Sequence, residues 1–331
     1  MVRLCPKRLF LAILLVGAFQ AGGGQALAYP SWKPYHWPVK PFTIQHPVQA
    51  AFGDPRTLYP IQPFGRTGPN LTGASSFHNG VDITAAAGTP VYPVVSGKVT
   101  KAQPDLISVT TADGRIFQYY HLDRTIKLGA RVTAQRTVIG RVKTKYCHVH
   151  MAEIDGTVVH NPLAPGHLTP YTDWTKPTIA GVYIDDGGGP RALVANHVGS
   201  RDRLVVAASD PPARPLTGTY AGLPQVPAVV EWRLIHGGPY THWTAAADFR
   251  LTEPPRRGFW QIYAPGTYQN LPVFDHRCFM TTPGRYLFRL GLNPARLVAG
   301  NYRLQVRVSD IRKNPSSFSW PLQIGKPKPP E

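Results

Sequence analysis

The sequence contains little of several features that would mark particular protein classes. Only three of its 331 residues are cysteine, which excludes a small fold held together by many disulfides. Acidic residues are also few, since 18 Asp and Glu stand against 36 Lys and Arg. Beyond residue 28, no apolar run approaches the roughly 18 residues that a membrane helix needs. We therefore expect no permanent membrane span.

The excess of basic residues gives a formal charge of +18 and favours anionic partners by long-range attraction. The cations are scattered singly, as at Arg115, Arg131 and Arg201, and no nucleic-acid motif accompanies them. We therefore expect the partner to be an anionic wall polymer, and we expect no nucleic acid.

The first 28 residues have the pattern of a secretory signal peptide. An apolar run at 9–19 follows three cations and precedes the small-residue triplet at 26–28. The cations are Arg3, Lys7 and Arg8. Cleavage before Tyr29 would leave a mature chain of charge +15. We expect this chain to be secreted or to lie in the periplasm or cell envelope.

Short apolar stretches separated by turn signals predict a mainly β chain. The 35 Pro and 31 Gly are frequent, and no apolar pattern of helical period is sustained over three turns. About 300 mature residues are enough for two domains. The predicted order is an extended Pro- and aromatic-rich arm at 29–44, a first domain at 45–165, a linker at 166–176, a second domain at 177–325 and a disordered tail at 326–331.

The second domain shows the alternation of a sheet with one buried face. Apolar and polar residues alternate from Tyr302 to Ser309, and several similar strands occur between 177 and 325. This pattern predicts an immunoglobulin-like β-sandwich. The region carries no catalytic constellation, so it could anchor substrate, contact a partner, shield a groove or simply stabilise the chain.

Two short motifs offer ligands for zinc. Residues 78–82 read His-Asn-Gly-Val-Asp, which sets an imidazole and a carboxylate four positions apart. Residues 148–150 read His-Val-His, and on a strand both imidazoles project from one face. Two His and one carboxylate would leave a fourth tetrahedral position open for water, as in catalytic zinc sites. Each motif alone also fits ordinary polar residues, and spacing does not decide between His148 and His150.

Three segments together resemble the LytM or lysostaphin type of zinc endopeptidase. The first signature of that family is similar to FHNGVDITAAAGTPVYPVVSGKV, its middle stretch to YYHLDRTIKLGARVTAQRTVIGRV, and its closing His-x-His strand to CHVHMAEI. The order and spacing make the resemblance specific over roughly residues 45–165. It implies a compact antiparallel β catalytic domain that binds one zinc ion at the floor of an open groove.

Carried over position by position, the resemblance implies a role for five residues. His78, Asp82 and His150 would bind zinc, and His121 and His148 would flank the activated water and the transition state. The implied activity is that of an exported zinc-dependent endopeptidase hydrolysing peptide bonds in bacterial peptidoglycan. The alternative is a non-catalytic cell-wall-binding or regulatory protein that retains the peptidase fold. Because positions 121 and 148 are both His, the sequence favours the enzyme.

The approach to the His-x-His strand departs from the family pattern. RVKTKYCHVH stands where a Gly-, Ser- and Thr-rich turn is usual, which affects the fit of a substrate in the groove. Cys147 in this segment and Cys278 are the cysteines that would survive signal cleavage. An exported protein with two cysteines invites a disulfide, but two buried thiols fit the sequence equally well.

Overall fold

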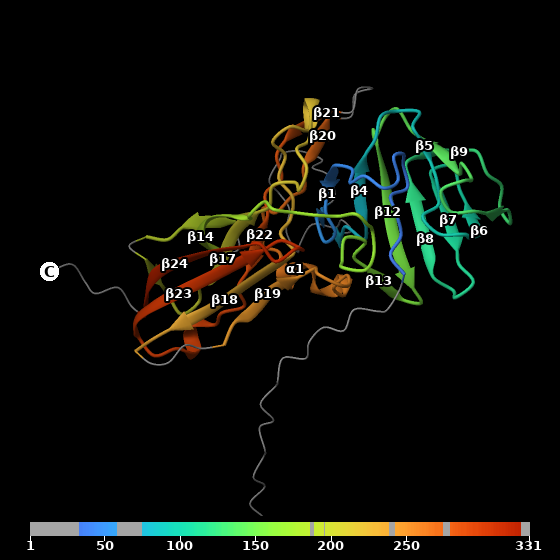
Figure 1. Ribbon diagram of the computed structural model, residues 1–331. Coiled ribbons are helices and arrows are strands. Elements are labelled where there is room, and N and C mark those ends of the chain that lie inside the picture. The colour runs from blue at the N-terminus through green and yellow to red at the C-terminus, as the bar shows by residue number, and fades with distance from the viewer. Residues whose placement is uncertain are drawn as a thin grey trace, which may run out of the picture.

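The computed structural model describes residues 33–57, 75–185, 189–194, 196–237, 242–273 and 279–325. The predicted mainly β fold class is confirmed (Figure 1). The helices in this part are short: α1 (Phe259–Ile262) and the 3-10 turns η1 (Gly218–Tyr220), η2 (Arg256–Gly258) and η3 (Pro294–Arg296). None of them could cross a membrane. The predicted signal peptide and the predicted tail after residue 325 lie outside the described residues.

The first half of the chain folds around an eight-stranded antiparallel sheet. Along the sheet, seven strands follow one another and an eighth, β13 (Val158–His160), pairs with β12. In order they are β1 (Val48–Ala50), β4 (Val81–Thr84), β12 (His148–Asp155), β8 (Ile116–Tyr120), β7 (Leu106–Thr110), β6 (Gly97–Ala102) and β10 (Arg131–Val132). A three-stranded sheet is formed by β5 (Pro90–Val91), β11 (Gly140–Val142) and β9 (Leu122–Arg124), and a ribbon by β2 (Pro55–Arg56) and β3 (Ser76–Phe77).

Strand β12 lies between β4 and β8, and its register fixes the neighbours of each histidine. His150 is opposite Asp82 on one side and opposite Tyr120 on the other. The alternate residues Val149 and Met151 are fully buried in the core. Because side chains alternate along a strand, this burial turns His148 and His150 together toward the opposite face.

The second half contains two sheets that contribute to one buried core (Figure 1). One has the order β15 (Pro190–Ala192), β14 (Thr178–Asp185), β17 (Arg203–Ser209) and β22 (Leu287–Arg289). The other has the order β16 (His197–Val198), β24 (Pro315–Ile324), β23 (Gly300–Ser309), β18 (Val229–Ile235) and β19 (Thr244–Asp248). A ribbon of β20 (Leu271–Val273) and β21 (Phe279–Thr282) stands apart. The immunoglobulin-like topology stays a prediction.

The two halves pack directly against each other beside the His-Asn-Gly-Val-Asp motif. The Phe77 ring, next to His78, lies 5.1 Å from the Phe259 ring and 5.9 Å from the Tyr263 ring, measured between centroids. The Tyr263 hydroxyl donates to the Gly53 carbonyl at 2.7 Å. The second half therefore covers the edge of the first domain at the point where the motif lies.

The predicted arm and linker are joined to each other. Trp37 is fully buried, and its indole N–H donates to the Pro170 carbonyl at 2.9 Å. Tyr35 forms a bridge with Leu168, which is also buried. Residues 35–37 and 167–171 thus close over one side of the first domain together.

Candidate metal centre

The three predicted ligands come from adjacent pieces of backbone. His78 follows β3, Asp82 lies on β4 and His150 on β12. Gly80 makes this approach possible, because a Cβ at that position would lie 2.2 Å from the Met151 carbonyl oxygen and 2.8 Å from the His150 ring. Any side chain at residue 80 would push the turn away from β12.

The ligand atoms of these residues converge on one point. His78 Nε2 lies 2.7 Å from His150 Nδ1, and both nitrogens lie 3.0 Å from Asp82 Oδ1. All three residues are buried. Among the described residues, they form the group of His, Cys, Asp and Glu side chains arranged to hold a metal ion.

The protonation states at this point suit a zinc ligand set, which requires neutral imidazoles and an ionised carboxylate. Burial lowers the pKa of His78 to about 3, so its ring is neutral at physiological pH. Burial alone would raise the pKa of Asp82, but the His78 and His148 imidazoles hold it well below its usual range. His78 Nδ1 lies 2.8 Å from the Ala51 carbonyl oxygen, to which it donates, so Nε2 is left with its lone pair toward the centre.

His148 lies immediately beside the three ligands. Its Nε2 is 3.7 Å from Asp82 Oδ1. At the other side of the ring, Nδ1 lies 2.7 Å from the Tyr146 carbonyl oxygen, which can only accept. Nδ1 also lies 2.9 Å from the Gln49 amide nitrogen, and Nε2 is the ring nitrogen nearest the Asp82 carboxylate.

His121 completes the site from the end of β8. Its ring centroid is 4.7 Å from that of His148, and it stacks on the Tyr146 ring at 4.0 Å. The backbone has φ +67°, a left-handed conformation that is unusual outside glycine. Two backbone hydrogen bonds, both 2.9 Å long, hold this conformation: the His121 N–H donates to the Asp105 carbonyl, and the Lys143 N–H donates to the His121 carbonyl. Burial lowers the pKa of the His121 ring to about 2, so it is neutral.

All five residues that the sequence singled out line one groove of about 530 Å³. Its opposite side is built by the second half of the chain, and we call these five residues the second-domain wall: Tyr220, Glu253, Arg256, Gln269 and Asn270. Sequence reasoning missed this wall because no local motif connects residues 220–270 with His78 or His150. Long-range contacts such as the packing around Phe77 bring them together.

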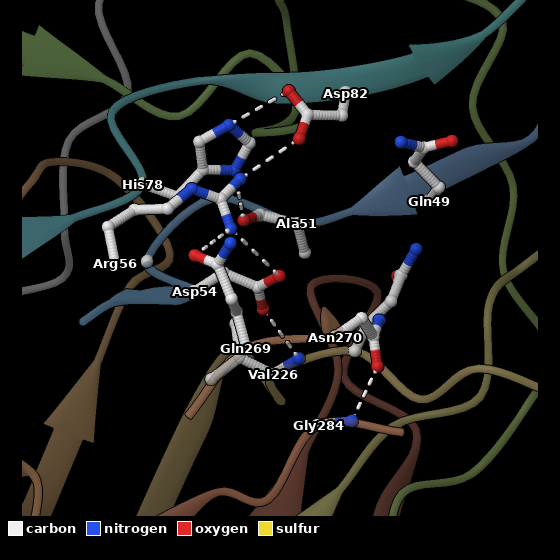
Figure 2. A network of polar contacts seen from close by, with 12 residues as sticks. Gln49, Ala51, Asp54, Arg56, His78, Asp82, Val226, Gln269, Asn270 and Gly284 are labelled. Carbon is white, nitrogen blue, oxygen red and sulfur yellow. Dashed lines mark hydrogen bonds and ion pairs between the residues drawn. The ribbon is translucent and has the colours of Figure 1, made fainter. Parts of the chain in front are cut away.

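Sequence reasoning also missed Arg56, which contacts a predicted ligand directly (Figure 2). Its Nη2 donates to Asp82 Oδ2 at 2.9 Å, and its Nη1 donates to Gln269 Oε1 at 3.1 Å. Nη1 also lies 3.8 Å from Asp54 Oδ2. Burial raises the pKa of Asp54 to about 7. Arg56 therefore connects the Asp82 carboxylate to the second-domain wall.

The unusual segment before His148 is fixed by a covalent bond. Cys147 is disulfide-bonded and has φ +50°. Cys278, its predicted partner, lies outside the described residues. Tyr146, the neighbour of Cys147, lines the groove and stacks on His121.

Comparison with known proteins shows that part of the chain is similar to one family. Residues 76–162 match the model of peptidase family M23, and no curated protein matches the chain. A mutant catalytic domain of the prophage-encoded M23 protein EnpA from Enterococcus faecalis is 27% identical, with 33% of this chain and 95% of that chain covered and a TM-score of 0.25.

Two further solved structures are similar over a comparable share of this chain. The SpoIIQ–SpoIIIAH pore forming complex is 24% identical, covering 40% of this chain and 90% of that chain, with a TM-score of 0.30. A zinc containing peptidase from Vibrio cholerae is 22% identical, covering 37% of each chain, with a TM-score of 0.27. Over residues 76–162 the chain is thus similar to peptidase family M23, and the resemblance predicted from its three motifs is confirmed.

Proposed function

We propose that this protein is an exported zinc-dependent endopeptidase that hydrolyses peptide bonds in bacterial peptidoglycan. The observation that carries the proposal is the convergence of two imidazoles and one carboxylate, with two more imidazoles beside them in an open groove. Structural zinc sites are closed by four protein ligands, whereas catalytic sites keep one position open. The described residues supply three ligands at this point, which favours a catalytic site.

The donor set fits zinc in the type of its atoms. His78 and His150 offer ring nitrogens and Asp82 offers Oδ1. A zinc ion held there would make water nucleophilic near neutral pH and would polarise the carbonyl of a peptide bond. The residue roles carried over from the family resemblance agree with this placement.

His148 and His121 would handle protons and developing charge. With Nδ1–H donating to the Tyr146 carbonyl, His148 would accept a proton at Nε2. The neutral His121 ring faces the same space and can hydrogen-bond the oxyanion that forms when a carbonyl is attacked. Such groups commonly contribute about 100-fold each to the rate.

The alternative is a non-catalytic cell-wall-binding or regulatory protein that retains the peptidase fold. The presence of both accessory imidazoles in the groove favours the enzyme, since a binding module would need neither. Digestion of purified peptidoglycan separates the two, because an endopeptidase releases new amino termini in proportion to time. A binding module would sediment with the polymer and release none.

The match to peptidase family M23 and the charge of +18 support peptidoglycan as the substrate. Cell walls are anionic, and a basic protein is attracted to them at low ionic strength. Removal of the metal by a chelator should stop the digestion, and readdition of zinc should restore it.

A further inference from the structure

The second-domain wall places an arginine beside the candidate metal centre. Arg256 begins η2 and lines the groove opposite the four histidines. Its Nε donates to the Ser75 carbonyl at 3.1 Å. Because Ser75 is only three residues before His78, this bond ties the arginine to the backbone that presents a predicted zinc ligand.

The other arginine that lines the groove, Arg56, is already engaged. Arg56 donates to Asp82 and to Gln269, and it also lies near Asp54 (Figure 2). Its guanidinium therefore serves the Asp82 carboxylate. The Asp82 carboxylate therefore compensates its positive charge.

Arg256, by contrast, forms no ion pair with any residue that the structure describes. The side chain is exposed, and only its Nε has a hydrogen-bond partner in the described part of the chain. The two terminal nitrogens of its guanidinium are the atoms that form bidentate contacts with carboxylates.

The acidic group closest to Arg256 on the wall leaves this charge largely uncompensated. Glu253 is half-buried, and burial raises its pKa to about 7, so about half of it is protonated at neutral pH. It makes no ion pair with Arg256, although the arginine charge lowers its pKa. A bound divalent cation would add positive charge to the same groove.

We propose that Arg256 is a specificity residue that binds a carboxylate on the substrate, close to the scissile peptide bond. The substrate class is then an anionic peptide, with the carboxylate carried on a side chain or at its C-terminus. The proposal rests on the proposed peptidase function for the identity of the ligand as a peptide. It gives the second domain a direct part in substrate selection.

Matched synthetic peptides test this assignment. A glycine-containing hexapeptide with one Glu and an amidated C-terminus is compared with its Gln twin, and the Gln peptide is also prepared with a free C-terminus. Binding to the zinc-loaded mature chain is measured by calorimetry, with His121→Ala to suppress turnover. We expect at least one carboxylate peptide to bind about tenfold tighter than the neutral twin.

The variant Arg256→Gln should abolish that preference while binding of the neutral twin stays unchanged. Arg257→Gln is the matched control, because Arg257 is adjacent and exposed but does not line the groove. It should keep the preference. With His121 restored, Arg256→Gln should raise KM for the carboxylate peptide and leave kcat close to that of the unsubstituted chain.

Equal binding of the carboxylate and neutral peptides, or no binding of either, would overturn the proposal. So would a preference that survives Arg256→Gln. If the carboxylate preference is present and lost in Arg256→Gln, but the unsubstituted chain hydrolyses neither peptide nor peptidoglycan, the inference stands and the proposed enzymatic function fails. If the unsubstituted chain hydrolyses both peptides with no preference, the proposed enzymatic function stands and the inference about Arg256 fails.

Discussion

Individual residues at the candidate metal centre depend on a second partner for their orientation. His78 is turned by its bond to the Ala51 carbonyl, and Asp82 is held at its second oxygen by Arg56. Second partners of this kind orient metal ligands and tune their basicity. The donor atoms are thus placed before any metal arrives.

We predict that Asp82→Asn and His78→Ala each weaken zinc binding by more than about 100-fold. Asp82→Asn keeps the shape of the side chain but removes the ionised donor. Zinc affinity is measured by competition with a chromophoric chelator. His236→Ala is the control, since His236 stacks on Tyr302 in the second half of the chain and should leave the affinity unchanged.

His121→Ala should separate metal binding from turnover. The ring lies beside His148 and is not part of the three-residue ligand group. We expect zinc content equal to that of the unsubstituted chain and kcat reduced about 100-fold or more. Loss of the zinc together with the activity would show that His121 is itself a ligand.

At the scale of the elements, β4, β8 and β12 explain why part of the site could be predicted. The spacing in His-Asn-Gly-Val-Asp and His-Val-His is local, so the sequence was sufficient to find His78, Asp82 and the paired histidines. Arg56 and Gln269 are 213 positions apart and meet only because the β2–β3 ribbon packs on the second half. No period or motif encodes such a contact.

The segment leading into β12 carries a testable covalent constraint. Cys147 is disulfide-bonded, and Cys278 is the only other cysteine in the predicted mature chain. We predict that proteolysis without reductant yields one peptide pair that contains both cysteines, identified by mass spectrometry. Reduction should add about two hydrogens to the mass of the mature chain. Two separate thiol-bearing peptides would contradict this.

Asp210, the residue that follows strand β17, should make the stability of the folded chain depend on pH. Burial, together with the charges of Asp173 and Asp310, raises the pKa of Asp210 from 3.8 to about 9. The folded state therefore holds a proton that the unfolded chain releases above pH 4. This contribution to stability is fully present below pH 4 and is lost as the pH rises toward 9.

Asp210→Asn should remove this dependence. We expect the Tm of the unsubstituted chain to fall more steeply between pH 5 and pH 9 than that of the variant, with a difference of about 3 °C at pH 9. Calorimetric scans in matched buffers measure it. Asp123→Asn, at an exposed position, is the control. Parallel curves for Asp210→Asn and the unsubstituted chain would contradict the assignment.

At the scale of the whole molecule, the sequence predicted a mainly β chain but not how its halves meet. One continuous core joins residues of both, and Phe77, Phe249, Phe259 and Tyr263 lie at the junction. Long-range packing of this kind leaves no periodic trace in either half. This packing nevertheless brings residues of the second domain to one side of the groove.

We propose above all that the groove of this molecule hydrolyses peptidoglycan with the help of a metal. The most direct measurement is the appearance of new amino termini, identified by mass spectrometry, when purified peptidoglycan is incubated with the mature chain. We predict release by the zinc-loaded chain, none after chelation, and recovery when zinc is restored. Equal release by metal-depleted and zinc-loaded protein, or no release by either, would contradict the account.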